Sequence, residues 1–168
     1  MMRHIAKQRS KGTRRLLIGL ISTTVFLSAC SGSRPTDIGV TNGKLLPCPE
    51  SPNCVNSRAN DSVHSIKAIH FKKPITQTEA ILAVKEALLS LPKIEIITET
   101  ETYLYAEATT KVMRFVDDVE FLFPNEELIQ EVHLRSASRL GYQDFDVNRL
   151  RIESVRAILI ENGLAVRE

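Results

Sequence analysis

Beyond residue 60, apolar residues follow two different spacings along the chain. Over residues 65–71 they alternate with polar residues, which is typical of a half-buried strand. Over residues 77–91 they recur every three or four positions, which predicts a helix. Thr76-Gln77-Thr78-Glu79 has the pattern of a capping box at the start of this helix, and Pro92 would end it. The buried side of the helix is expected to carry Ile81, Val84, Leu88 and Leu91.

Four runs rich in β-branched and aromatic residues follow, at residues 94–98, 102–109, 112–123 and 128–136. Their short connections predict antiparallel neighbours. A last helix is predicted over residues 147–162, with Asp146 as its N-cap and Asn162-Gly163 as its stop. Its inner side is expected to carry Val147, Leu150, Val155, Ile158 and Leu159.

The order of these elements is β-α-β-β-β-β-α, which predicts an α+β fold. We expect a single domain over residues 47–163. It would contain an antiparallel sheet of about four to five strands with two helices packed on one face. Residues 164–168 would form a C-terminal tail.

The N-terminal residues have the pattern of a secretory signal. Residues 1–15 are basic and polar, and residues 16–27 form an apolar run that is short for a membrane span. The segment Leu27-Ser28-Ala29-Cys30 resembles the lipobox of bacterial lipoprotein precursors. An uncleaved anchor helix is the alternative, but the cysteine stands where a lipobox requires it. We therefore expect residues 1–29 to be removed and Cys30 to carry a diacylglyceryl group.

This lipid would anchor the chain to a membrane of the cell envelope, because two acyl chains suffice for stable anchoring. Ser31 follows the cysteine, which in a Gram-negative host favours the outer membrane, with the domain facing the periplasm. Residues 30–46 are rich in Gly, Ser, Thr and Pro and have no periodic apolar pattern. The sequence therefore predicts a flexible tether between the anchor and the domain.

Two further cysteines, Cys48 and Cys54, flank a short loop that is rich in proline. With Cys30 lipidated they form an even pair in an oxidising compartment, which favours a disulfide. Closing so short a loop would stabilise the fold by about 2 kcal/mol. A redox pair would show C-x-x-C at a helix start, and zinc binding with His64 or His70 lacks the usual ligand spacing, so both alternatives are weaker.

The charge of the chain depends on the signal. The full sequence has 22 Lys and Arg against 20 Asp and Glu, a formal charge of +2, but its first 29 residues hold six of the basic residues and no acid. The processed chain would therefore keep 16 basic residues and have a formal charge of −4. The basic pI of about 8.5 gives no reason to expect nucleic-acid binding.

An acidic stretch and an arginine-rich stretch are the most distinctive polar features of the predicted sheet. Alternation places Asp118 and Glu120 on the face opposite the apolar one, and it turns His133 and Arg135 to the same face. A hairpin closed tightly over residues 124–127 would set Asp118 opposite His133. We therefore predict an Asp118–His133–Arg135 cluster on the outer face of the sheet.

Asp117 falls on the apolar face of its strand, where an unpaired carboxylate would be costly. One interpretation pairs it with an arginine beyond the strand, of which Arg139, Arg149 and Arg151 are candidates. The other is a β-bulge at Asp117-Asp118 that turns both acids outward. The sequence leaves both open.

Paired carboxylates suit acid–base chemistry or a hard cation, with Asp117, Asp118 and Glu120 as oxygen ligands. Acids on a strand with arginines nearby are more often structural ion pairs, which is the interpretation we favour. Ser136 and Ser138 lack the nucleophile-elbow pattern, and the sequence has no zinc-protease, P-loop or dinucleotide motif. We therefore predict no catalytic residue, no metal and no cofactor.

Several motifs, taken together and in order, carry a resemblance to a known family. They are Cys48-Pro49 with Ser51-Pro52-Asn53-Cys54-Val55, Asp117-Asp118-Val119-Glu120-Phe121, Arg135-Ser136-Ala137-Ser138-Arg139 with Gly141, and Asp146-Val147-Asn148-Arg149-Leu150-Arg151-Ile152. The chain resembles the bacterial domain-of-unknown-function family 1499 over about residues 47–162.

This family has no agreed activity, so the resemblance implies a fold and little mechanism. Members commonly carry a small residue, often glycine, near Asp146, where this chain has Phe145. The resemblance also singles out six polar positions, which fit a structural network as well as a site: Arg135, Arg139, Asp144, Asn148, Arg149 and Arg151.

The leading hypothesis from the sequence is a non-enzymatic envelope lipoprotein that binds a protein partner or stabilises an envelope assembly. A second hypothesis is a carrier or sensor of an apolar ligand held between the sheet and the C-terminal helix. Phe115, Phe121, Phe123 and Leu134 would line its cavity. The third is an acid–base or metal-assisted enzyme built on the acidic stretch with His133.

Overall fold

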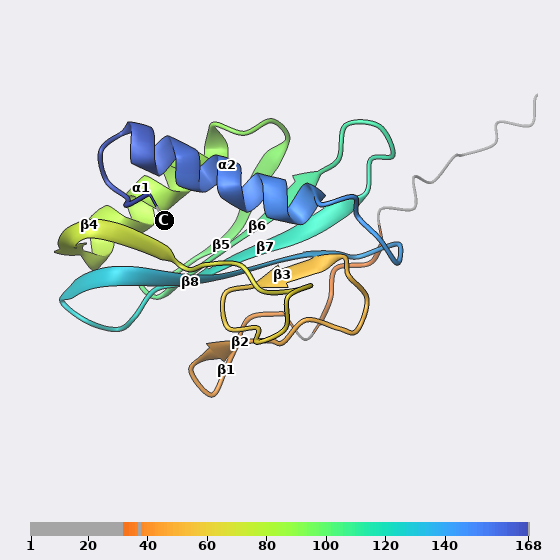
Figure 1. The fold of residues 1–168 in the computed structure, drawn as a ribbon, viewed down its shortest axis with the longest axis horizontal. Helices are drawn as coiled ribbons and strands as arrows, with labels where there is room; N and C mark the ends of the chain where they lie inside the picture. Colours follow the sequence, from red (N-terminus) through yellow and green to blue (C-terminus); the bar gives the residue numbers. More distant parts are fainter. Residues whose placement is uncertain (1–31, 37, 168) are drawn as a thin grey trace, which may run out of the picture.

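An antiparallel sheet forms the centre of the fold (Figure 1). The computed structural model describes residues 32–36 and 38–167. In these residues six strands make up the main sheet, of which five lie in one row and the sixth, β4 (Ile69–Thr76), pairs with β8. The row runs β3 (Cys54–Asn56), β8 (Leu128–Ser138), β7 (Val116–Leu122), β6 (Tyr103–Thr109) and β5 (Ile94–Glu99).

Two helices, α1 (Gln77–Leu89) and α2 (Val147–Glu161), pack side by side on one face of the sheet (Figure 1). The predicted order is confirmed in the run from β4 to α2, and so is the α+β class. The sheet has one strand more than expected, because β3 was not predicted. The capping box at α1 is confirmed as well, since Thr76 and Glu79 cap each other's backbone N–H groups.

The core lies between the helices and the inner face of the sheet, and Phe121, Phe123 and Leu134 are fully buried in it. The buried side of α2 differs from the prediction: Leu150 is exposed, whereas Asn148 and Ile152 are buried. The helix is rotated because Asn148 is hydrogen-bonded inside the protein, and a polar residue gives no sign of burial in a hydrophobic pattern.

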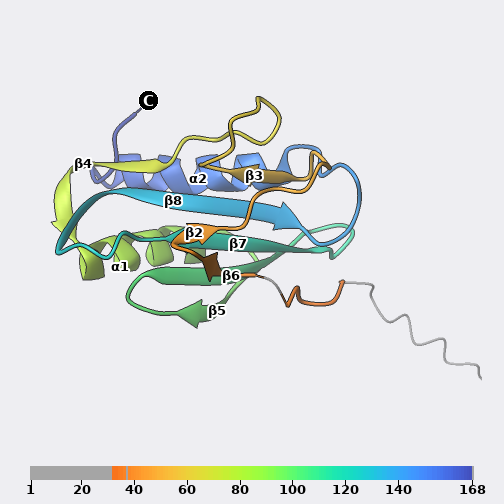
Figure 2. The same cartoon turned by 90° about the horizontal axis from the view of Figure 1, so that it is seen from below.

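A small hairpin, β1 (Val40–Thr41) and β2 (Lys44–Leu45), lies over the opposite face of the sheet (Figure 2). Leu45 is buried there, and the Asn56 amide donates to the Leu46 carbonyl at 2.7 Å. Residues 38–46 therefore do not form part of the flexible tether that the sequence predicted. They lie over the outer face of the sheet, and we call this segment the N-terminal cover.

Three other segments differ from the prediction. Residues 112–115 form a loop that Thr110 closes through its N–H bond to the Phe115 carbonyl at 2.8 Å, so β7 begins only at Val116. The strand expected at residues 65–71 is shifted to Ile69–Thr76. The expected C-terminal tail pairs in part with β4, because the Val166 N–H donates to the His70 carbonyl at 2.9 Å.

The signal, the lipobox and Cys30 lie outside the described residues. Among the residues that are described, no helix is both long and apolar enough to cross a membrane.

Candidate functional site

The pairing of β7 with β8 decides which polar side chains meet. Glu120 lies opposite Arg135, and Asp118 lies opposite Ala137. The predicted pairing of Asp118 with His133 is therefore wrong, and so is the cluster built on it. The register is shifted by four residues because pairing with β7 begins only at His133, after the first five residues of β8, so the connection is longer than predicted. An even shift changes partners but leaves every side chain on its expected face.

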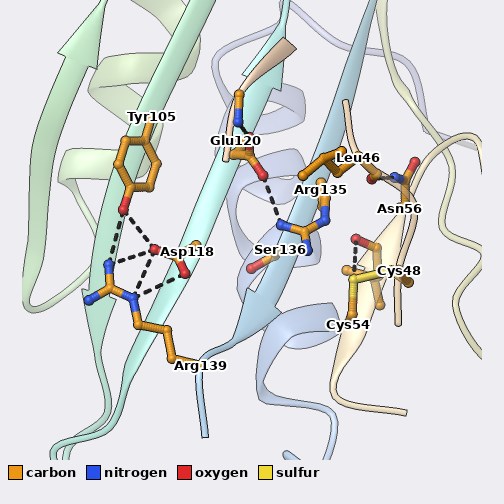
Figure 3. A network of polar contacts seen from close by, with 12 residues as sticks. Leu46, Cys48, Cys54, Asn56, Tyr105, Asp118, Glu120, Arg135, Ser136 and Arg139 are labelled. Atoms are coloured by element: carbon orange, nitrogen blue, oxygen red, sulfur yellow. Dashed lines mark hydrogen bonds and ion pairs between the residues drawn. A yellow bond between two sulfur atoms is a disulfide. The ribbon is translucent and has the colours of Figure 1, made fainter. Parts of the chain in front are cut away.

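On the outer face of the sheet, Asp118 is bound by Arg139, which lies just beyond the end of β8 (Figure 3). The Nε of Arg139 lies 3.1 Å from both carboxylate oxygens, and its Nη2 lies 2.6 Å from Oδ1. The hydroxyl of Tyr105 also donates to Oδ1, at 2.7 Å. Both partners of this ion pair are almost fully buried. Asp118 is thus held by three donor groups rather than turned toward solvent.

The groups around this pair shift one another's ionisation. Burial, and then the hydrogen bond to the Asp118 carboxylate, raise the pKa of Tyr105 well above its usual value. Burial alone would lower the pKa of Arg139, but hydrogen bonds to Asp118 and Glu107 outweigh burial and raise it. Burial would raise the pKa of Glu107, yet bonds from Arg34 and Arg139 lower it overall. At neutral pH Glu107 and Arg139 are therefore charged, and the Tyr105 hydroxyl keeps the proton that it donates to Asp118.

Glu120 forms a second pair on the same face, with Arg135 at 2.9 Å (Figure 3). Glu120 is fully buried beneath the N-terminal cover. Its other oxygen accepts from the Tyr103 hydroxyl at 2.8 Å and from the Gly39 N–H at 2.9 Å. Burial and the charge of Glu120 raise the pKa of Tyr103. This pair therefore ties the N-terminal cover to the sheet.

Asp117 lies on the inner face, as alternation predicted. The register of β7 with both neighbours is continuous through Asp117 and Asp118, so the β-bulge interpretation is wrong. Of the three candidate arginines, Arg151 of α2 is the partner, with its Nη2 at 2.5 Å from Oδ2. The Oδ1 atom is buried and has no hydrogen-bond partner among the described residues.

Asn148 connects the start of α2 to the sheet. Its side-chain oxygen accepts from Ser136 at 2.6 Å, and its side-chain nitrogen donates to Ser138 at 2.9 Å and to Asp144 at 2.7 Å. Asp144 also accepts from the Asn148 N–H at 3.0 Å. Asp144 therefore caps this helix, in place of the expected Asp146, which makes no side-chain cap bond within the described chain.

The remaining predicted residues lie apart from these pairs. Arg149 donates to the carbonyls of Ser65 and Val63 at 2.7 and 2.9 Å. Within the described residues it forms no ion pair with Asp117. His133 lies on the outer face opposite Leu122, at the end of the β7–β8 pairing away from Asp118. Its ring is 3.3 Å from the Ser57 hydroxyl. Burial, and then the charge of Arg58, lower the pKa of His133.

The disulfide between Cys48 and Cys54 is confirmed, with the two Cα atoms 5.7 Å apart. Cys54 belongs to β3 and lies opposite Ala137, on the outer face of the sheet. Cys48 follows the N-terminal cover in the chain. The bond therefore fixes the end of the cover to the edge of the sheet (Figure 3).

A pocket of about 350 Å³ lies where the inner face of the sheet ends beside the start of α2. We call it the loop pocket, because most of its lining residues come from the segments 110–115 and 138–147. Most of its wall is apolar, from Val112, Met113, Phe115 and Phe145, and Asp117 is the acid of the sheet that reaches it. Sequence reasoning missed this pocket, since it placed Val112 and Met113 in a strand.

Metal ligation can be assessed for the described residues. Within them, no three His, Cys, Asp or Glu side chains are grouped closely enough to hold a metal ion. The acids of the predicted cluster point to different faces and bind different arginines.

Comparison with known proteins gives a family and no characterised relative. No curated protein and no solved structure matches the chain. A family model matches residues 44–159, which include both outer-face ion pairs, the disulfide and most of α2. The chain belongs to the protein family of unknown function DUF1499.

Proposed function

We propose that this chain is a lipid-anchored, non-enzymatic binding module of the cell envelope, and that the loop pocket is its binding site. The observation that carries the binding site is Asp117. Asp117 lines the apolar loop pocket, and its buried Oδ1 atom lacks a hydrogen-bond partner among the described residues. A buried acceptor without a donor is costly, so a ligand that brings one would gain affinity.

The pocket indicates the chemistry of this ligand. Its apolar wall favours a hydrocarbon body, and a volume of about 350 Å³ is at the small end of known ligand sites. Arg151 already balances the charge of Asp117. The ligand therefore needs a hydrogen-bond donor but no positive charge, which favours a hydroxyl or amide group on an apolar chain.

The geometry gives less support to an acid–base enzyme. Such a site needs acids that converge in an open cleft. Asp118 and Glu120 are instead buried, each paired with its own arginine. His133 is a partner of neither acid. These pairs fit a structural brace, as the sequence favoured.

A carrier with its cavity in the middle of the domain is also less well supported. Phe121, Phe123 and Leu134 are packed in the core. Phe115 differs from them, because it lies at the loop pocket. The second hypothesis of the sequence analysis thus keeps its ligand class but moves its site to the end of the sheet.

Binding is tested with two matched probes, 1-octanol and its methyl ether, by calorimetry on the purified protein. The alcohol has the donor that Asp117 lacks and the ether does not, so we expect clearly tighter binding of the alcohol. Met113→Glu at the pocket should abolish binding. Leu128→Glu, at the far end of β8 and 54% exposed against 64% for Met113, should not. Equal affinity for alcohol and ether would contradict the site.

The anchor is tested separately, in bacteria that express the full chain with labelled palmitate. We expect label on the protein, an intact mass that matches cleavage before Cys30, and loss of both in Cys30→Ala. A protein that stays unlabelled, or that keeps residues 1–29, would refute the anchor while leaving the pocket to be judged by its own test.

A further inference from the structure

We infer that the domain docks on the membrane with one defined end, the end that carries the loop pocket. The occupant of this surface is the phospholipid layer that holds the anchor. We call the surface the docking face, and it consists of Lys111, Val112, Met113, Arg114, Tyr142 and Phe145. This inference rests on the proposed lipid anchor and adds to it an orientation of the domain.

The first observation is where the described chain begins. Gly32 lies against the loop after β8, because a Cβ atom on it would lie only 2.9 Å from the Cβ of Arg139 and 3.3 Å from the Cγ of Leu140. Cys30 precedes Gly32 by two residues, which span at most about 7 Å. A lipid on Cys30 is thus confined to this end of the domain.

The second observation is what else lies at this end. The 110–115 loop and the 139–146 loop are both found there, beside the start of the described chain, in two perpendicular views (Figures 1 and 2). Both loops line the same pocket. The side chains are unusually exposed for their type: Val112 by 87%, Met113 by 64%, Tyr142 by 71% and Phe145 by 87%. Clustered apolar exposure of this kind marks an interaction surface.

The composition of the docking face matches a lipid surface. Apolar and aromatic side chains suit the boundary between headgroups and acyl chains, where tyrosine and phenylalanine can place their rings. The flanking Lys111 and Arg114 are exposed and positively charged, which suits anionic phosphate groups. The mouth of the loop pocket would then open toward the membrane.

The third observation is the backbone at Phe145. Its φ angle is +53° and that of Asp146 is +62°, in the left-handed region that a bulky side chain adopts only at a cost. The turn is held in this conformation by Asp144, which accepts from the N–H groups of Asp146 and Val147, both at 3.2 Å. The fixed turn leaves the Phe145 ring 87% exposed, and a lipid surface at this end would bury it.

The test uses a tryptophan reporter, because the sequence contains no tryptophan. The lipidated full chain is prepared as Phe145→Trp and, separately, as Leu128→Trp. Leu128 is the control, because it is 54% exposed and lies at the other end of β8. The 11 residues of this strand span about 33 Å. Both proteins are anchored in vesicles of phosphatidylethanolamine and phosphatidylglycerol, with and without bromine on the acyl chains.

We expect bromolipids to quench the fluorescence of Phe145→Trp at least twofold more than that of Leu128→Trp, with a blue-shifted emission in the first variant only. Equal quenching of the two variants, when both float with the vesicles and carry the lipid mass, would overturn the docking face and leave the anchor intact. Failure of both to carry lipid or to float would overturn the anchor, and with it the orientation.

Discussion

The Asp118–Arg139 pair is the sharpest test of whether the polar network is a structural brace. Its side chains are only 3% and 6% exposed. Replacing Arg139 by methionine keeps much of the volume but leaves the Asp118 carboxylate buried, with the Tyr105 hydroxyl as its remaining donor of the three. Removing one member of a buried pair typically costs about 3–5 kcal/mol of the free energy of unfolding.

That loss is measured by urea unfolding of the oxidised domain. With a slope of about 2 kcal/mol per molar urea, the unfolding midpoint should fall by about 2 M. Arg139→Lys keeps the charge without the planar fork and is expected to lie between the wild type and Arg139→Met. In the double variant Asp118→Asn/Arg139→Met, part of the loss should be recovered, with a coupling of about 0.5–3 kcal/mol.

Arg34→Ala is the matched control, because Arg34 binds the same Glu107 oxygen as Arg139 but is 52% exposed. An exposed ion pair contributes little, so this variant should unfold with the wild type. If Arg139→Met also unfolds with the wild type, the pair is not a brace. If it stays stable and yet loses binding of 1-octanol, the pair belongs to a functional site instead.

Three further predictions concern the same face of the sheet. Tyr105→Phe removes a buried hydroxyl that donates to Asp118, and should lower the free energy of unfolding by about 1–3 kcal/mol, by urea unfolding. Replacing Cys48 and Cys54 together by serine should cost about 2 kcal/mol, the value for so short a loop, whereas no change would show that the cover does not depend on the bond. The lowered pKa of His133 means that the unfolded chain binds its proton first, so stability should fall as the pH drops below about 6.5, and His133→Gln should flatten this slope in thermal unfolding.

Local signals explain most of what the sequence predicted correctly. The capping box of α1, its stop, the disulfide and the strand order depend on neighbouring residues or on composition, which a sequence displays directly. Alternation gave the right face to Asp117, Asp118 and Glu120, because side-chain direction has a period of two and survives an even error in register. Their partners could not be predicted in the same way.

The predicted register of β7 with β8 was wrong because β8 is longer than β7. Leu128 to Val132 pair with β4 and extend beyond β7, so the connection is wider than its sequence indicated. The prediction of a flexible tether at residues 38–46 was wrong for another reason. Residues 38–46 have no periodic apolar pattern, and they are held by hydrogen bonds to Glu120 and Asn56 that only the folded sheet provides.

The Glu120 contact suggests why the outer face is charged although it is buried. A buried ion pair is weak evidence for stability, but it fixes geometry, and here the acid also binds the Gly39 N–H of the cover. Glu120→Gln keeps an acceptor for Gly39 but loses the charge that holds Arg135. We expect faster hydrogen exchange over residues 38–46 than in the wild type, measured by mass spectrometry.

The control for this prediction is Asp117→Asn, which disturbs a buried pair on the inner face, away from the cover. A general loss of stability would speed exchange over residues 38–46 equally in both variants. A specific role for Glu120 requires a larger effect in Glu120→Gln than in Asp117→Asn. If the two variants exchange alike, the cover is held by other contacts, and the buried charges of this face have no part in tying the N-terminal segment to the domain.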